Sequence, residues 1–118
     1  MRRKCQRFLI LVVACIVAAP AFAQRGAMTI FEQIQKVAWL TRTWGDCYGY
    51  LLVAIGRAEL MVDGSLSPWD AAALQVAVEE AGGVFTDWGG RATAFSDGAV
   101  ATNAVLAPAL RRELGIPG

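Results

Sequence analysis

The stretch Ser67-Pro68-Trp69-Asp70-Ala71-Ala72-Ala73, which continues to Glu79-Glu80-Ala81-Gly82-Gly83, carries signals for both ends of one helix. Ser67 is a favourable N-cap, and Pro68 then falls at the first helical position, where its missing N–H removes no hydrogen bond. Gly82-Gly83 is a natural stop. The residues between these signals are apolar almost all round, which predicts a buried helix over Pro68–Ala81.

Asp70 would place a carboxylate in the first turn of this helix. One interpretation is structural, because Asp70 can stand in for the acidic partner of a capping box and its charge suits the positive end of the helix dipole. The other is chemical, because a phosphate-handling metal site can be built on a carboxylate at that place. The helix pattern by itself leaves both interpretations open.

The segments around this helix alternate between helical and strand patterns. Apolar residues at steps of three and four predict helices over Thr29–Leu40 and from Trp44 to Ile55, and a last helix is expected over Val105–Leu114. Short strands are expected at Ala58–Asp63, Val84–Asp87 and Gly98–Thr102. Helices that alternate with strands predict the α/β class, with layers of helix, sheet and helix.

The first 23 residues have the three parts of a secretory signal peptide. Residues 1–7 are basic, Phe8–Ala19 is a run of twelve uncharged residues, and Ala21-Phe22-Ala23 resembles a cleavage site. The apolar stretch is shorter than the roughly 20 residues of a spanning helix. We therefore expect an apolar signal-like helix over residues 1–23, cleaved or kept as an anchor, with residues 24–118 as the domain.

Charge and residue types exclude several classes of function. Four of the 11 basic residues lie in the predicted leader, which leaves seven basic against ten acidic residues and a formal charge of −3. This balance argues against nucleic acid as a partner. The chain has no histidine, so histidine-based triads and histidine-ligated zinc are excluded. Cys47 is the one cysteine after the leader, and we expect it to be a small buried residue.

Several motifs occur in the order and spacing of a known family. They are Leu40-Thr41-Arg42-Thr43-Trp44-Gly45-Asp46-Cys47-Tyr48-Gly49-Tyr50, Pro68-Trp69-Asp70-x-Ala72-Ala73, Glu80-Ala81-Gly82-Gly83 and Ala101-Thr102-Asn103. From about Phe31 to Gly118 the chain resembles the C-terminal portion of the inositol monophosphatase family. The stretch around Asp46 is most similar to the branch that acts as histidinol-phosphate phosphatase.

The resemblance implies a Mg²⁺-dependent phosphomonoesterase and part of an αβαβα layered sandwich. In that family a Trp-Asp motif at a helix start supplies a metal-ligating carboxylate, and Asp70 matches it. Asp63 matches a position near the hydroxyl or amine part of the substrate, and Asp46 and Arg42 belong to the branch-specific stretch that would read the substrate head group. The implied substrate is histidinol phosphate or a similar polyol phosphate. Its hydrolysis belongs to cytoplasmic biosynthesis, whereas the leader predicts export or anchoring.

One family feature is absent from the sequence. The other metal ligands of the family lie in its N-terminal half, in a glutamate and an Asp-Pro-Ile/Leu-Asp-Gly-Thr segment, and this chain has no such segment. We therefore expect this chain to be roughly the last third of the enzyme and to be inactive alone. Its expected partners are a complementing N-terminal chain or a second copy, and a membrane only through the N-terminal segment. The alternatives are an exported or tethered binding protein without catalysis, and a fragment without function.

Overall fold

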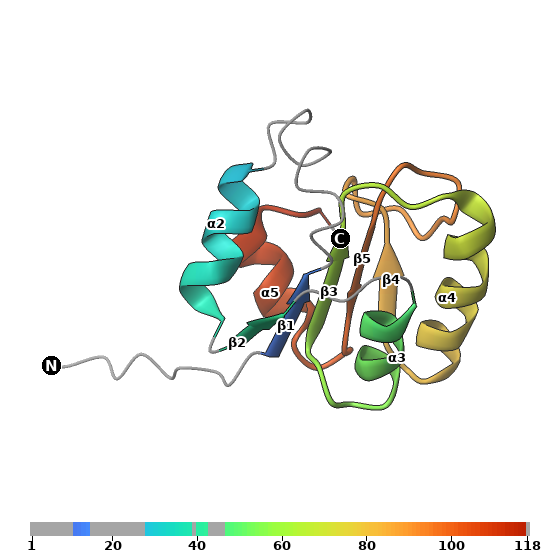
Figure 1. The fold of residues 1–118 in the computed structure, drawn as a ribbon, viewed down its shortest axis with the longest axis horizontal. Helices are drawn as coiled ribbons and strands as arrows, with labels where there is room; N and C mark the ends of the chain where they lie inside the picture. Colours follow the sequence, from blue (N-terminus) through green and yellow to red (C-terminus); the bar gives the residue numbers. More distant parts are fainter. Residues whose placement is uncertain (1–10, 15–27, 39, 43–46, 118) are drawn as a thin grey trace, which may run out of the picture.

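Strands and helices alternate along the chain and form one sheet with helices on both faces (Figure 1). The computed structural model describes residues 11–14, 28–38, 40–42 and 47–117. The strands are β1 (Leu11–Ala14), β2 (Leu40–Arg42), β3 (Leu60–Asp63), β4 (Val84–Thr86) and β5 (Ala99–Thr102). The helices are α2 (Met28–Val37), α3 (Tyr48–Ala54), α4 (Pro68–Glu80) and α5 (Ala107–Leu114).

The sheet is mixed, with the strand order β2-β1-β3-β5-β4. Strand β1 pairs in parallel with both β2 and β3, whereas β5 pairs antiparallel with both β3 and β4. Asp63 is the last residue of β3 and lies opposite Ala99, the first residue of β5. The turn that follows β3 and the loop that leads into β5 therefore lie at the same end of the strands.

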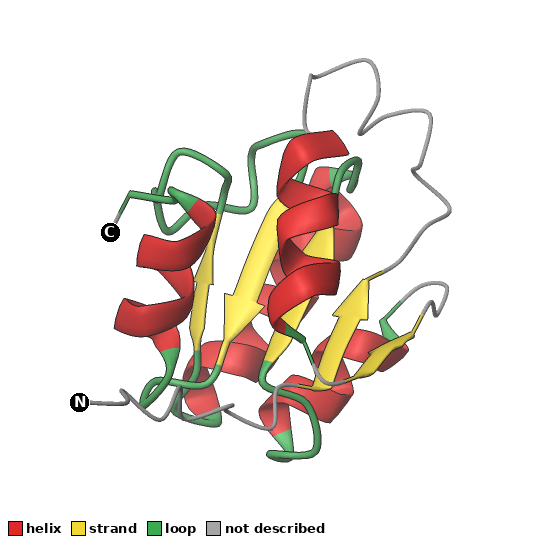
Figure 2. Ribbon diagram, turned by 90° about the vertical axis from the view of Figure 1, so that its left-hand side faces the viewer, coloured by secondary structure: helices red, strands yellow, loops and turns green. Residues whose placement is uncertain are grey.

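Alternation along the central strands divides the core into two clusters, as expected when both faces of a sheet are covered. Met61 of β3 faces the cluster with α3 and α4, whereas its neighbours Leu60 and Val62 face the cluster with α5 and Ile34 of α2. Figure 1 shows the two helix pairs on opposite sides of the sheet, and Figure 2 shows the strands side by side between them. The described residues thus form the predicted α/β fold in three layers, helix, sheet and helix.

Most predicted elements are present with slightly different bounds. Helix α4 begins at Pro68 and has Ala81 as its C-cap, so both of its predicted ends are confirmed. The second predicted helix is present as α3 from Tyr48 onward, and its first predicted residues lie outside the described residues. The helix expected over Thr29–Leu40 ends at Val37, because Leu40 instead begins β2 and pairs with β1. The sequence pattern does not predict this strand, because β2 is three residues long and depends on a partner distant in sequence.

The signal-like helix expected over residues 1–23 is wrong for the part that the structure describes. Leu11–Ala14 form strand β1, which pairs on both sides within the sheet. A short apolar run with two valines suits a central parallel strand as well as a helix, and periodicity cannot separate the two. The other residues of the predicted leader lie outside the described residues. Within the described part, no helix has the length and apolar character that crossing a membrane requires.

Helix α4 is partly exposed in this chain, although its apolar sequence is typical of a helix that is covered on all sides. Only Ala71 and Val78 of α4 are buried, and its outward side chains include Val76, which is 60 % exposed. The described residues therefore leave much of the surface of α4 uncovered. Further large apolar side chains are exposed elsewhere among the described residues: Tyr48, Leu51, Ile55, Phe95 and Val105.

Candidate active site

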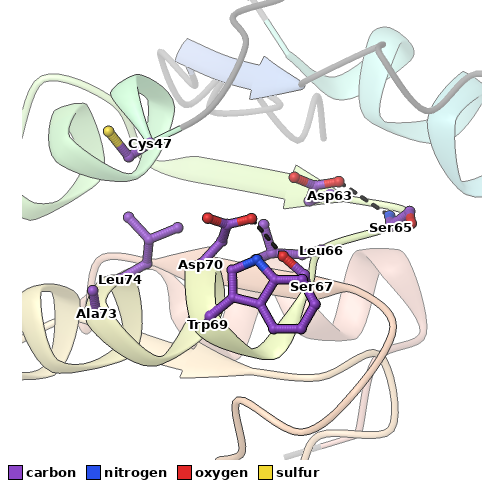
Figure 3. A pocket seen from close by; sticks show the side chains of 9 residues that line it. All are labelled: Cys47, Asp63, Ser65, Leu66, Ser67, Trp69, Asp70, Ala73 and Leu74. Carbon is purple, nitrogen blue, oxygen red and sulfur yellow. Dashed lines mark hydrogen bonds between the residues drawn. The ribbon is translucent and has the colours of Figure 1, made fainter.

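A pocket of about 590 Å³ lies where the turn after β3 meets the start of α4. Two carboxylates, those of Asp63 and Asp70, line it, and Figure 3 shows them on the same side of the connecting turn. The remaining lining residues are Cys47, Ser65, Leu66, Ser67, Trp69, Ala73 and Leu74. The pocket is therefore built largely from the turn and the first turns of α4, where the sequence motif lies.

The Asp63 carboxylate is held at the end of β3 by its own turn. Its Oδ1 accepts a hydrogen bond of 3.1 Å from the backbone N–H of Ser65, a local arrangement typical of aspartate in turns. Asp63 is buried, and this burial raises the pKa of its carboxyl above the usual value. The Ser65 N–H opposes that rise, and the nearby charge of Asp70 adds to it. The two carboxylates therefore act on each other electrostatically.

Asp70 lies in the first turn of α4, as predicted, but the capping box is not formed. Ser67 has an extended backbone and makes no side-chain hydrogen bond to an N–H of the helix. Its hydroxyl instead donates to Oδ2 of Asp70. Asp70 is exposed and directed at the pocket, so it lies neither deep in the core nor away from a cleft. The carboxylate of Asp70 therefore accepts a hydrogen bond from Ser67 and is exposed at the pocket.

Two further residues at the pocket are exposed. Cys47 was expected to be buried, but it is exposed and lines the pocket just before α3. Trp69, the residue before Asp70, is 79 % exposed.

Arg42 and Asp46 are not brought into this site by the described geometry. Arg42 lies on the edge strand β2, exposed, where its guanidinium donates to the carbonyl of Thr41. It does not line the pocket. Asp46 lies outside the described residues, although Cys47, which follows it, lines the pocket. The roles of both residues in reading a substrate stay predictions.

The carboxylate oxygens of the pocket suit Mg²⁺ chemically, but they are too few to complete its coordination. Mg²⁺ takes hard oxygen ligands in octahedral geometry and usually keeps several waters, so Asp70 has suitable chemistry. Among the described residues, however, no group of three or more histidine, cysteine or acidic side chains is placed to hold a metal ion. Asp63 and Asp70 alone form an incomplete magnesium site.

A model of the inositol monophosphatase family matches residues 5–115. The chain belongs to the inositol monophosphatase family. The match includes most of the segment that the sequence pattern predicts to be a leader. It also includes the whole of the pocket described above.

The chain is similar in sequence to proteins named histidinol-phosphatase. The chain is 46 % identical over 85 residues to a histidinol-phosphatase of Chlorobaculum parvum, covering 71 % of this chain and 33 % of that protein. It is 38 % identical over 85 residues to a histidinol-phosphatase of Mycobacterium tuberculosis, covering 72 % of this chain and 33 % of that protein. The chain thus spans about a third of the length of the curated relatives that it matches.

Solved structures of the inositol monophosphatase family have the same fold. An inositol monophosphatase from Zymomonas mobilis superposes with a TM-score of 0.77 at 28 % identity, over 90 % of this chain and 42 % of that one. An inositol monophosphatase of Thermotoga maritima superposes with a TM-score of 0.71 at 24 % identity, over 98 % of this chain and 43 % of that one. The helix–sheet–helix layers therefore correspond to less than half of these larger chains.

Proposed function

We propose that this chain carries the C-terminal portion of a Mg²⁺-dependent phosphomonoesterase that acts on histidinol phosphate or a similar amino-alcohol or polyol phosphate. The observation that carries the proposal is that Asp63 and Asp70 line the same pocket. The relatives named histidinol-phosphatase support the substrate class.

Asp70 would hold the metal in this proposal. Its carboxylate is exposed, is aimed at the pocket and is bonded on one side only by the Ser67 hydroxyl. Magnesium bound there supplies positive charge that polarises a phosphate ester and lowers the pKa of a coordinated water. The remaining ligands would come from outside the described residues, because among those residues no third acidic side chain is placed with Asp63 and Asp70 to hold a metal ion.

Asp63 would bind the part of the substrate that carries hydroxyl or amine groups. Its carboxylate is fixed by Ser65 and accepts hydrogen bonds or pairs with an ammonium group when ionised. Arg42, at the end of β2, and Asp46, between β2 and α3, would contribute to recognition of the head group. A complementing chain or a second copy would complete the assembly.

A binding protein without catalysis is the second candidate, and the exposed apolar side chains favour it. Contiguous exposed apolar surface is typical of sites where proteins associate. Val76 and Trp69 of α4 are 60 % and 79 % exposed. The two candidates differ in their dependence on Asp70, since association through an apolar surface does not require that carboxylate.

A chimaera tests the phosphatase proposal. The matching third of the Chlorobaculum parvum histidinol-phosphatase is replaced by the corresponding segment of this chain, and Mg²⁺-dependent phosphate release from histidinol phosphate is measured. We expect activity, and loss of it in the chimaera with Asp70→Asn. Glu80→Gln, at the other end of α4, is the matched control and should keep activity. Full activity with Asp70→Asn would show that the metal role is wrong.

A further inference from the structure

Three hydrogen bonds hold the turn between β3 and α4 in place. The side chain of Asp63 accepts from the backbone N–H of Ser65 at 3.1 Å. The backbone N–H of Leu66 donates to the carbonyl of Asp97 at 2.7 Å. The indole Nε1–H of Trp88 donates to the carbonyl of Asp63 at 3.0 Å. The last two bonds come from the segment between β4 and β5, so the turn is fixed from outside itself.

Gly98 makes the approach of Trp88 to Asp63 possible. A Cβ added at Gly98 would lie 2.5 Å from the carbonyl oxygen of Asp63 and 2.7 Å from Nε1 of Trp88. Distances under 3 Å are too short for a carbon, so any side chain at this position would separate the donor from its acceptor. The glycine therefore leaves the space in which the hydrogen bond forms.

Trp88 also packs against the core. Its ring is partly buried against the cluster that contains Leu60, Val62 and Val100. These residues belong to the two central strands β3 and β5. The indole thus packs on the sheet and at the same time holds the carbonyl of Asp63 by a hydrogen bond.

We propose that Trp88 is a positioning residue whose indole N–H fixes the backbone at Asp63 and so gives the Asp63 carboxylate one direction in the pocket. The catalytic meaning of this inference rests on the proposed function, since Asp63 faces a substrate only if the pocket is a phosphatase site. Fixed supporting contacts of this kind are what keep a binding side chain in its productive orientation.

The test measures the side-chain rotamer of Asp63 by NMR in the chain without substrate. Three-bond couplings from its carboxyl carbon to the backbone nitrogen and carbonyl carbon report whether χ1 is single or averaged. The variants are Trp88→Phe and a replacement of Trp88 by benzothienylalanine, which keeps the ring shape and lacks the N–H. Phe95→Leu is the control, because Phe95 is 83 % exposed in the same segment.

We expect a single χ1 in the unmodified chain and in Phe95→Leu, and averaged couplings in both Trp88 variants. A role limited to stability would change the free energy of unfolding but not the rotamer of the folded protein. Unchanged couplings in the benzothienylalanine variant would overturn the inference. Exchange of the Trp88 indole proton in the unmodified chain gives a second measure, and exchange as fast as in free indole would also overturn it.

A Mg²⁺ titration of the unmodified chain separates this inference from the proposed function. Absence of any response at Asp70 would count against the metal site and would leave the rotamer result standing. A response at Asp70 together with an Asp63 rotamer that does not depend on Trp88 would support the proposed function and overturn the positioning role.

Discussion

Asp63, the last residue of β3, and Asp70, in the first turn of α4, line one pocket, and the charge of Asp70 helps to raise the pKa of Asp63. Burial is the larger cause of that rise. Two acidic groups seven residues apart are thus brought into one electrostatic site by a strand end, a tight turn and a helix start. Placing a buried carboxylate beside a second one costs stability, which is typical of sites shaped for binding.

Asp63→Asn should stabilise the fold at neutral pH. Because its pKa is raised in the folded state, the folded chain binds the proton more tightly, and stability falls as pH rises from the ordinary aspartate value through the raised folded value. The penalty is absent below that range and complete above it. We expect a gain of about 1 kcal/mol at pH 7 and little gain at pH 3, from urea unfolding. Equal gains at both pH values would contradict this electrostatic origin.

Asp87 should have the opposite effect on stability. Its carboxylate is buried and accepts hydrogen bonds from the backbone N–H of Arg91 at 2.8 Å and from Nε of Arg91 at 2.9 Å. Burial pushes the pKa of Asp87 upward, but these bonds and the Arg91 charge outweigh it, so the pKa lies below its usual value.

The stabilisation from Asp87 is therefore complete above the ordinary aspartate pKa and is lost as pH falls through the lowered folded value. We expect Asp87→Ala to cost about 2 kcal/mol at pH 7, because the hydrogen bonds from Arg91 to a charged acceptor are lost. The cost should shrink in strong acid. Thermal unfolding at several pH values measures it, and Glu32→Gln on the exposed face of α2 serves as a control with a cost near zero.

Two glycines with positive φ should respond differently to alanine. Gly56 (φ 78°) has open space where a Cβ would lie, whereas a Cβ at Gly90 (φ 84°) would lie 2.3 Å from the carbonyl oxygen of Pro117. We expect Gly56→Ala to cost about 1 kcal/mol through backbone strain alone. Gly90→Ala should cost about 3 kcal/mol, because the C-terminal segment must also move. Equal costs in denaturant unfolding would show that Pro117 does not pack there in solution.

The sequence predicted helix α4 better than it predicted the surroundings of that helix. Helix α4 was predicted at both ends because Pro68 and Gly82 act locally, through a fixed φ and a left-handed backbone. The place of Asp70 followed from those ends. Both signals act within the helix and its caps and do not depend on tertiary contacts.

Features that depend on long-range contacts could not be predicted in this way. Strand β1 was mistaken for part of a helix, because only its pairing with β2 and β3 distinguishes a short apolar run as a strand. The exposure of Val76 is decided by which side of α4 the sheet covers. The bond from Trp88 to Asp63 joins residues 25 apart, and no local pattern signals it.

The most direct test of the central account follows the carboxyl carbon of Asp70 by NMR while Mg²⁺ is added to the purified chain. We expect a saturable shift at Asp70, and weak binding, because the ligand set is incomplete. Asp70→Asn should abolish the response at neighbouring resonances. Ser67→Ala removes the hydroxyl that donates to Asp70 and leaves the carboxylate in place, so it should keep the response. No saturable shift, or the same response in Asp70→Asn, would contradict the account.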